Sequence, residues 1–358
     1  MENECYTISF SILNSVEKGV YAMVTIYDVA AASGFSPATV SKAFNSYPGI
    51  SPKTYEKIMA TAKEIGYVPN SIARALSTKK SWLVGMLFSE ELSTGIKHPH
   101  FSEIFSSAQI KLSKAGYDVV FINNSLGGGN ISYLDHCRYR DVEGVFIAAS
   151  AQFGHVVQCI IESDIKMVSV EMTYPEKYSV ISENYNGAVL AMEHLYSMGH
   201  RKIAFISGPM NSLAAPERYN GYLDFLAAKN LPFDSELVSE AVEFTAQAGY
   251  DASTRLLSNA RGKFTALFAG YDDIACAAIN CFKSHGLAVP WDVSVVGFDD
   301  LPLTEESGLT TIRQDREKIG CIAADLLIAQ MQNLPIDKPF DMRVPTTLVV
   351  RSSCRSVE

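Results

Sequence analysis

The chain lacks the features that would place it in a membrane or outside the cell. It has no apolar run near the roughly 20 residues that span a bilayer. Its start, Met1-Glu2-Asn3-Glu4, has none of the positive charge that opens a secretory signal. The seven cysteines are scattered without a Cys-x-x-Cys pair, which disfavours a disulfide framework or a zinc site. We therefore expect a reduced, cytosolic protein.

Charge is also scarce, and it is unevenly placed. Charged residues make up 19% of the 358 residues and apolar residues 47%, a globular composition that predicts two or three domains. The net charge of −9 disfavours nucleic acid as a partner of the whole chain. Residues 23–80, however, hold seven basic and three acidic residues, a net of +4 that leaves −13 for the remainder. This contrast favours a small polyanion-binding head on an acidic body.

Residues 25–66 carry start and stop signals for three short helices. Thr25, Ser36 and Ser51 are N-cap residues, and glycine ends the first and third helices at Gly34 and Gly66. Apolar residues follow each start at helical spacing. Two helices joined across a tight turn and backed by a third predict a helix-turn-helix unit.

After residue 80, short apolar runs alternate with helical patterns. This alternation predicts parallel sheets covered by helices on both faces, and its length predicts two lobes. Ligands of such folds bind at the carboxyl ends of the strands. The expected strands are 83–88, 118–123, 144–148, 167–170, 202–207, 265–269 and 294–297, and the expected helices are 101–115, 188–198, 218–229, 246–258 and 273–285. The glycines of 127–130 predict a flexible turn, because no Gly-Lys-Ser/Thr follows as in a phosphate loop.

Several motifs resemble one family of proteins. TIYDVAAASGFSPATVSKAFN at 25–45, ISPKT at 50–54, IGYVPN at 65–70 and ARAL at 73–76 resemble the DNA-binding head and hinge of the lactose-repressor (LacI/GalR) family of bacterial transcriptional regulators. HLYSMGHRKIAFISGP at 194–209, ERYNGY at 217–222, VSVVGFDD at 293–300 and LTTIRQ at 309–314 resemble its core, which is similar to periplasmic sugar-binding proteins. The resemblance covers about Thr25 to Cys354.

This resemblance implies that the second helix enters the major groove of DNA. Pro37 and Ala38 offer apolar contact that suits a thymine methyl group, and Lys42 can donate to guanine. Many relatives have arginine there, and lysine lacks its two-pronged geometry. Ordinary helix capping is the alternative role for the hydroxyl groups. The other expected DNA contacts of the head are Ser36 and Ser41, with Thr25, Thr39, Asn45 and Tyr67 as phosphate contacts.

The hinge at 71–77 is about two turns long if helical. Isolated helices below roughly 12–15 residues are marginal in water, so we expect it to fold only with DNA and a partner hinge. The resemblance implies that the two Leu76 side chains of a dimer wedge into the minor groove. Alternatively, Leu76 packs on Trp82 or on the lobe surface. Asn70 and Arg74 are further candidate contacts.

For the core, the resemblance implies a small-molecule site between the lobes. We expect Arg218 to open a helix and donate a fork of hydrogen bonds to hydroxyl groups, with a surface salt bridge as the alternative. Asp299 ends a strand, where binding carboxylates belong, with a helix cap as the alternative. Phe244 fits a stacking position. The remaining candidates are His98, His100, Phe101, Glu171, Tyr271 and Gln314.

Two departures limit what the resemblance implies for this site. Tyr271 stands where relatives often carry asparagine, so no relative's ligand can be assigned to this chain. His98 and His100 have the spacing of metal ligands, but two ligands without partners make a weak metal site. We expect no metal, no cofactor and no catalytic residues, because no nucleophile elbow is present.

The predicted fold is a small all-α helix-turn-helix head joined by a hinge helix to an α/β core of two doubly wound lobes. The head spans 23–69, the hinge and linker 70–80 and the core 81–358. The lobes are expected at about 81–183 with 313–344, and at about 184–312 with 345–358. Met23 matches the usual start of the family, so we interpret 1–22 as a non-native or disordered extension.

The predicted function is a homodimeric regulator, a repressor of carbohydrate genes that binds double-stranded operator DNA. A sugar or sugar phosphate between the lobes would control operator affinity, and no membrane is involved. The short C-terminus disfavours a zipper-type tetramer. The alternatives are a sugar-binding sensor without a DNA role, an enzyme on an α/β scaffold, and a family member that uses a corepressor or a phosphocarrier protein.

Overall fold

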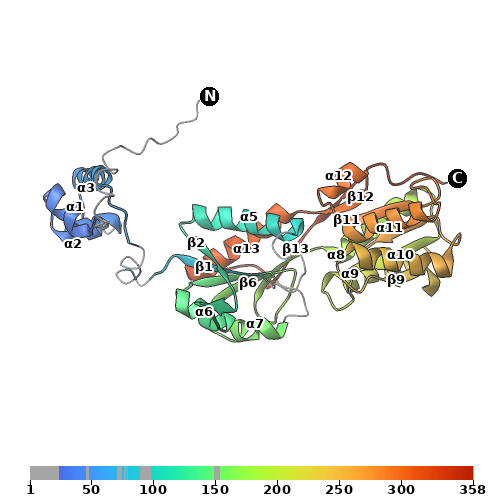
Figure 1. Ribbon diagram of the computed structural model, residues 1–358, viewed down its shortest axis with the longest axis horizontal. Helices are drawn as coiled ribbons and strands as arrows, with labels where there is room; N and C mark the ends of the chain where they lie inside the picture. Colours follow the sequence, from blue (N-terminus) through green and yellow to red (C-terminus); the bar gives the residue numbers. More distant parts are fainter. Residues whose placement is uncertain are drawn as a thin grey trace, which may run out of the picture. The chain divides into compact units, whose positions relative to one another are not determined.

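The computed structural model describes residues 24–45, 48–70, 75, 78, 80–88, 98–148 and 154–357. Its contacts divide the chain into two units, Met1–Ser81 and Trp82–Glu358, which are described separately below (Figure 1). The expected extension 1–22 and the hinge residues Arg74 and Leu76 lie outside the described residues.

The head contains the three predicted helices, α1 (Ile26–Ser33), α2 (Pro37–Phe44) and α3 (Pro52–Glu64). The Asp28 carboxylate accepts hydrogen bonds from the Thr25 amide at 2.8 Å and from the Thr25 hydroxyl at 2.7 Å, which fixes the start of α1. Gly34 ends this helix in the left-handed conformation, with φ of 75°. The small core that joins the helices consists of Val29, Ala30, Val40, Ala43, Ile58 and Ala62.

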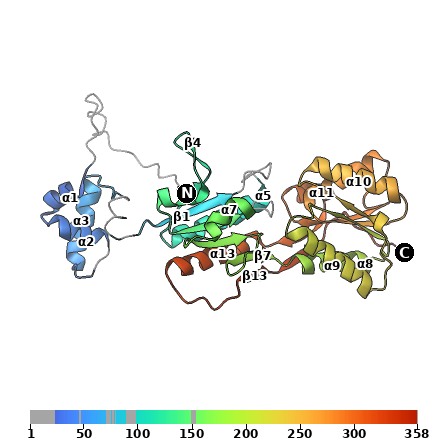
Figure 2. The same cartoon turned by 90° about the horizontal axis from the view of Figure 1, so that it is seen from below.

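The first lobe of the core is an entirely parallel sheet with helices on both faces (Figures 1 and 2). Helices α5 (Pro99–Lys114) and α13 (Arg316–Met331) cover one face, and α6 (Tyr133–Arg140) and α7 (Gly154–Ile161) cover the other. In spatial order the strands are β13 (Asp341–Val344), β7 (Tyr178–Ser182), β6 (Lys166–Val170), β5 (Gly144–Ala148), β1 (Leu83–Phe88) and β2 (Asp118–Ile122).

The second lobe repeats this plan, with one antiparallel strand at its edge. Helices α10 (Ala246–Ala260) and α11 (Asp272–Ser284) lie on one face, and α8 (Asn184–Ser197) and α9 (Ala214–Ala228) lie on the other (Figure 2). The short α12 (Leu303–Ser307) follows β11. In spatial order the strands are β14 (Thr346–Val349), β12 (Thr310–Gln314), β11 (Ser294–Asp299), β10 (Ala266–Ala269), β8 (Ile203–Ser207) and β9 (Val238–Glu240).

The chain crosses between the lobes three times, after β7, after β12 and after β13. The sequence placed the second crossover at 312–313, whereas β12 remains in the second sheet through Gln314. Because β7 and β12 end at the junction and α8 and α13 begin there, their terminal residues face the space where the strands of both lobes end.

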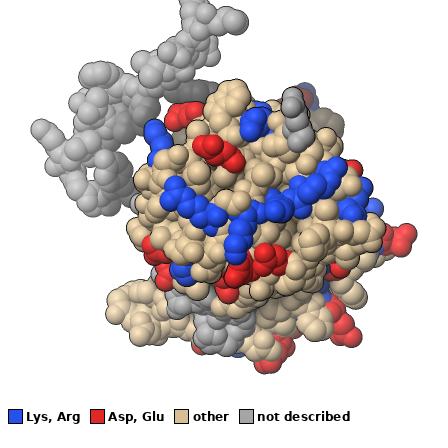
Figure 3. Space-filling model, turned by 90° about the vertical axis from the view of Figure 1, so that its right-hand side faces the viewer, with Lys and Arg blue, Asp and Glu red and all other residues tan. Residues whose placement is uncertain are grey.

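The far edge of the second lobe carries a band of basic side chains (Figure 3). Its parallel strands begin at this edge, so α8, α9, α10 and α11 end there. Arg201 donates to the Tyr196 carbonyl at 2.8 Å, and Arg261 donates to the His285 carbonyl at 2.9 Å. Cations at helix C-termini stabilise the helix dipole. These contacts therefore give Arg201 and Arg261 a structural role at the helix ends.

The sequence missed several elements, which include strands inside the sheets as well as edge strands and helices. β7, β9, β12, β13, β14, α6, α7 and α13 were not predicted. The expected turn at 127–130 closes a hairpin of β3 (Ser125–Leu126) and β4 (Gly129–Asn130). The described part of the chain contains no helix with the length and apolar character of a membrane span, and Cys137, Cys276, Cys281, Cys321 and Cys354 are free thiols.

Candidate DNA-binding head and effector site

The exposed side of α2 carries the residues that were predicted to contact bases. Val40 and Ala43 are buried against α1 and α3, while Pro37, Ala38 and Lys42 are exposed. The Ser36 hydroxyl accepts a hydrogen bond from the Thr39 amide at 3.1 Å and caps the helix. The N-terminal turn of α2 is therefore rigid and presents short side chains, as a helix that enters the major groove requires.

The candidate phosphate contacts of the head have partners within it. Asn45 donates to the Ser41 hydroxyl at 3.4 Å. The Tyr67 ring packs edge-on against Phe44, with 5.2 Å between the ring centroids, and burial raises the pKa of its hydroxyl. Thr25 and Ser36 have the capping role that the sequence left as an alternative. The Thr39 hydroxyl lies 2.9 Å from that of Ser36, and Asn70 is exposed.

Arg218 is a large charged side chain buried in the candidate effector site, with 1% of its surface exposed. Its Nε donates to the Asn184 side-chain oxygen at 3.0 Å, and its Nη1 donates to the Gly270 carbonyl at 2.5 Å. The guanidinium lies 3.6 Å from the centroid of the Phe298 ring. Arg218 lies within α9 rather than opening it, and the alternative of a surface salt bridge is wrong.

The carboxylate of Asp299 lies beside this guanidinium, with 3.5 Å between Oδ1 and Nη1 of Arg218. The Gln314 amide donates to the same oxygen at 2.5 Å. Asp299 and Asp300 both have positive φ, 127° and 56°, which is strained for residues other than glycine. Arg316 donates to the carbonyls of both, at 2.6 and 3.2 Å, and so holds this conformation.

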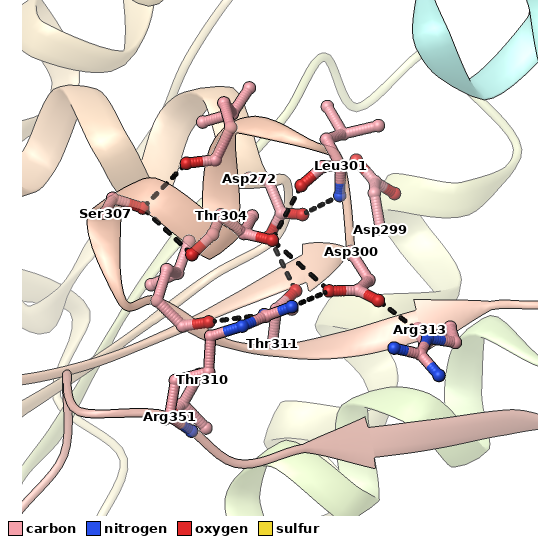
Figure 4. Close-up of polar contacts among 12 residues, drawn as sticks. Asp272, Asp299, Asp300, Leu301, Thr304, Ser307, Thr310, Thr311, Arg313 and Arg351 are labelled. Carbon is pink, nitrogen blue, oxygen red and sulfur yellow. Dashed lines mark hydrogen bonds and ion pairs between the residues drawn. The ribbon is translucent and has the colours of Figure 1, made fainter.

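A network of polar side chains next to Asp299 holds the loop at 299–301 in place (Figure 4). Asp300 accepts from Arg313 at 2.6 Å and from Arg351 at 2.7 Å. Burial would raise the pKa of Asp300, but these two hydrogen-bonded guanidinium groups outweigh it and hold the pKa below its usual value. Asp272 is fully buried and accepts from Thr311 at 2.6 Å and from the Leu301 amide at 2.9 Å.

Asp272 and Asp299 interact as buried like charges. Burial and the nearby Asp299 raise the pKa of Asp272 to about 8. Burial also raises the pKa of Asp299, although Arg218 opposes the rise. The two carboxyl groups therefore titrate as a pair above the usual range for aspartate.

Asp272→Asn should flatten the pH dependence of stability. The folded-state pKa of Asp272 lies above the ordinary value of 3.8, so the folded protein favours the protonated carboxyl group. The stability that this preference contributes is fully present below pH 3.8 and is lost as the pH rises toward about 8. Between about pH 6 and about pH 8, the wild type should lose about 2–3 kcal/mol of unfolding free energy relative to the variant. Denaturant unfolding at both pH values measures this difference, and equal pH dependence in the two proteins would contradict it.

The first lobe contributes the start of α5 and the end of β6. The His98 Nδ1 caps α5 by accepting from the His100 amide at 3.3 Å, and its Nε2 lies 3.6 Å from Asp273 of the second lobe. The Nε2 of buried His100 lies 3.5 Å from the Glu171 carboxylate. Phe101 packs edge-on against His100, 5.0 Å between centroids. Each histidine therefore faces a carboxylate, and the described residues contain no cluster of three metal-ligating side chains.

Tyr271 and Phe244 form an aromatic corner of the site. Their ring centroids are 4.9 Å apart in an edge-on arrangement, and the Tyr271 ring also lies 4.4 Å from the Arg218 guanidinium. The Tyr271 hydroxyl is 3.4 Å from that of Ser212. A Cβ atom at Gly208 would overlap the Tyr271 ring, so glycine at this position makes room for the tyrosine.

Four buried polar atoms of this site have no hydrogen-bond partner within the described residues. They are Nδ1 of His100, Oε1 of Glu171, Nδ2 of Asn184 and Oε1 of Gln314. Buried polar atoms are almost always paired, so these four are suited to a bound molecule. The sequence missed Asn184, together with Asp273 and Arg316. The position of Asn184 just beyond the end of a strand could have marked it as a site residue, but that strand, β7, was also missed.

The comparisons with known proteins agree with both parts of the chain. Residues 25–70 match the family model described as bacterial regulatory proteins, lacI family. Residues 192–354 match the model of a periplasmic binding protein-like domain. Among solved structures, the lac repressor dimer bound to operator and an anti-inducer has a TM-score of 0.77 at 26% identity, covering 93% of this chain and 99% of that one. A complex of the transcriptional regulator CelR with cellobiose has a TM-score of 0.67 at 30% identity, covering 92% and 99%.

Curated relatives match over nearly the whole chain. The transcriptional regulator CelR of Thermobifida fusca is 31% identical over 335 residues, which are 92% of this chain and 98% of that protein. The ribose operon repressor of Halalkalibacterium halodurans is 30% identical, covering 94% and 98%. The chain therefore belongs to the LacI family of bacterial regulatory proteins, and it is a DNA-binding transcriptional regulator rather than an enzyme.

Proposed function

We propose that this regulator is a homodimeric repressor of carbohydrate genes that acts on DNA in the cytoplasm. Each head reads half of an operator through the exposed side of α2, and a small sugar-like effector binds between the lobes at Arg218 and Asp299. The observation that carries the effector site is the buried Arg218–Asp299 pair, surrounded by unpartnered polar atoms. The similarity to a ribose operon repressor and to a regulator solved with cellobiose supports a carbohydrate role.

The face of α5 and α13 supports the proposed dimer. A groove of about 440 Å³ lies on it, lined by Ser102, Glu103, Ser106, Ser107, Ile110, Lys111, Lys114, Glu317 and Cys321. Ile110 on α5 is 49% exposed, and Phe121 on the neighbouring edge strand β2 is 52% exposed. Exposed apolar side chains beside a groove are typical of an interface between subunits.

The effector would act through its different affinities for two arrangements of the lobes. An effector coupling of about 1–3 kcal/mol corresponds to a change in operator affinity of about 5- to 150-fold. The geometry fits an inducer and a corepressor equally, since both would use the same site.

Lys42→Ala tests the head. An operator duplex is first selected from genomic fragments with the wild-type protein. The variant should bind it about 10- to 100-fold more weakly at fixed salt, because a base-edge contact is worth about 1–3 kcal/mol. Fluorescence anisotropy measures the change in Kd.

Lys283→Ala is the matched control for this measurement. It removes the same charge from an exposed position at the end of α11 in the core. It should change operator affinity less than threefold. Equal effects of the two substitutions would contradict the assignment of Lys42 to the DNA interface.

A further inference from the structure

The first residue of the core, Trp82, has a backbone conformation that bulky side chains rarely adopt. Its φ is 57°, in the left-handed region. Apart from glycine, the other described residues with positive φ are aspartate, asparagine or glutamate. Aspartate and asparagine tolerate this region through local hydrogen bonds, whereas tryptophan has no such compensation. Because residues held in strained conformations cluster at functional sites, Trp82 is a candidate functional residue.

Three contacts with the first lobe hold Trp82 in this conformation. Its amide donates to the Glu143 carboxylate at 2.8 Å, and its carbonyl accepts from the Asp118 amide at 2.8 Å. Its ring packs against that of Tyr117, with 5.4 Å between the ring centroids, and against the core of the lobe. Rotation about the N–Cα bond of Trp82 would therefore break the hydrogen bond to Glu143 or move the packed ring.

The same N–Cα bond sets the direction of the chain that precedes the core. Residues 78–81 separate Trp82 from the expected hinge at 71–77. Four extended residues reach about 13–14 Å, so a reversal at Trp82 would displace the hinge by a distance of that order. In a dimer, the effective concentration of the second head at an operator falls when its linker points away from the DNA.

We propose that Trp82 is a positioning residue for operator binding. Its left-handed backbone directs the linker so that the two hinges of a dimer reach one operator together. This proposal rests on the proposed dimeric operator binding and adds the residue that aligns the core with its linker. Trp82 needs no contact with DNA for this role, because it acts through the direction of residues 78–81.

Trp82→Gly tests the proposal, since glycine adopts either sign of φ and has no ring to hold. The full-length variant should bind the operator duplex selected with the wild type at least tenfold more weakly, as measured by fluorescence anisotropy at fixed salt. Tyr178→Gly is the matched control for lost packing. Tyr178 packs against the same core from β7, and β5 and β6 lie between that strand and β1. The control should bind within threefold of the wild type, and equal losses in both variants would overturn the proposal.

Glu143→Ala keeps the ring of Trp82 and removes the acceptor of its amide. This variant decides the matter if Trp82→Gly does not fold. It should bind the operator at least threefold more weakly than the wild type. The loss of a carboxylate by itself favours binding to DNA, so a weaker affinity would not come from the change in charge. Wild-type operator affinity of Glu143→Ala would contradict the proposal.

A flexible insertion separates linker direction from stability. A Gly-Gly-Ser-Gly-Gly-Ser segment between Lys80 and Ser81 makes the direction of the hinge independent of Trp82. The insertion should weaken operator binding, and adding Trp82→Gly to it should change the affinity less than threefold. Multiplied losses would show that Trp82 acts through stability alone and would overturn the proposal.

The wild-type protein separates this proposal from the proposed function. If it selects no duplex from genomic fragments, both fail. If it binds an operator and Trp82→Gly binds that operator equally well, only the role of Trp82 fails.

Discussion

Arg218→Ala should abolish stabilisation by the effector and lower the unfolding free energy by about 3–5 kcal/mol. The side chain is 1% exposed, and its removal leaves the buried Asp299 carboxylate without its cation. It also leaves the Asn184 oxygen and the Gly270 carbonyl without donors, and opens a void between Phe298 and Tyr271. Burial thus makes Arg218 a structural residue as well as a candidate ligand-binding residue.

Two further variants separate these roles. Arg218→Lys keeps the charge but cannot hold Asn184 and Gly270 with one planar group, so its stability should lie between wild type and alanine. Arg255→Ala is the control, since Arg255 is exposed in the same lobe and donates to the Glu240 carbonyl. It should change stability by less than about 1 kcal/mol. Urea unfolding measures the three stabilities, and an Arg218→Ala protein as stable as wild type would refute the structural role.

Ile110→Glu should convert the proposed dimer into monomers and reduce operator affinity at least 100-fold. The substitution places a charge on the exposed face of α5, at the apolar side chain of the groove, where it would be buried without a partner in the proposed subunit interface. A monomer presents one head at a time and loses the gain of two linked contacts with the operator. Light scattering gives the mass in solution, and anisotropy gives the affinity.

Leu334→Glu provides the comparison for this substitution. Leu334 is 53% exposed in the same lobe, but it lies beyond the end of α13 and does not line the groove. It should leave both the mass and the operator affinity unchanged. If Ile110→Glu remains dimeric while the control behaves as wild type, the interface lies elsewhere on the core.

The head could be predicted closely because its structure is encoded locally. Thr25 with Asp28, Ser36 with Thr39 and Gly34 at a helix end are caps whose partners lie within a few residues. The apolar strands of the core were recognised for the same reason. A short apolar run predicts a buried strand without any knowledge of the segments that pack against it.

The candidate effector site could be predicted only in part, because its contacts join distant segments. Arg218 was expected to open a helix and to donate to a ligand, whereas it lies within α9 and donates to Asn184 and to the Gly270 carbonyl in the interior. The strand before Asn184 was missed because Ser179 and Ser182 interrupt its apolar pattern. The Ser179 hydroxyl is buried in contact with that of Ser169 at 2.8 Å, a pairing that no local pattern reveals.

The side chain of Arg316 has a mechanical consequence. Its Nε is bonded to Glu103 on α5, while its two terminal nitrogens hold the carbonyls of Asp299 and Asp300. A guanidinium is planar and rigid, so these three bonds share one orientation. If α5 shifts relative to the loop at 299–300, the fork must release at least one oxygen. Arg316 thus couples α5, the helix of the proposed dimer interface, to the loop at 299–300, and a shift of either one breaks at least one of these bonds.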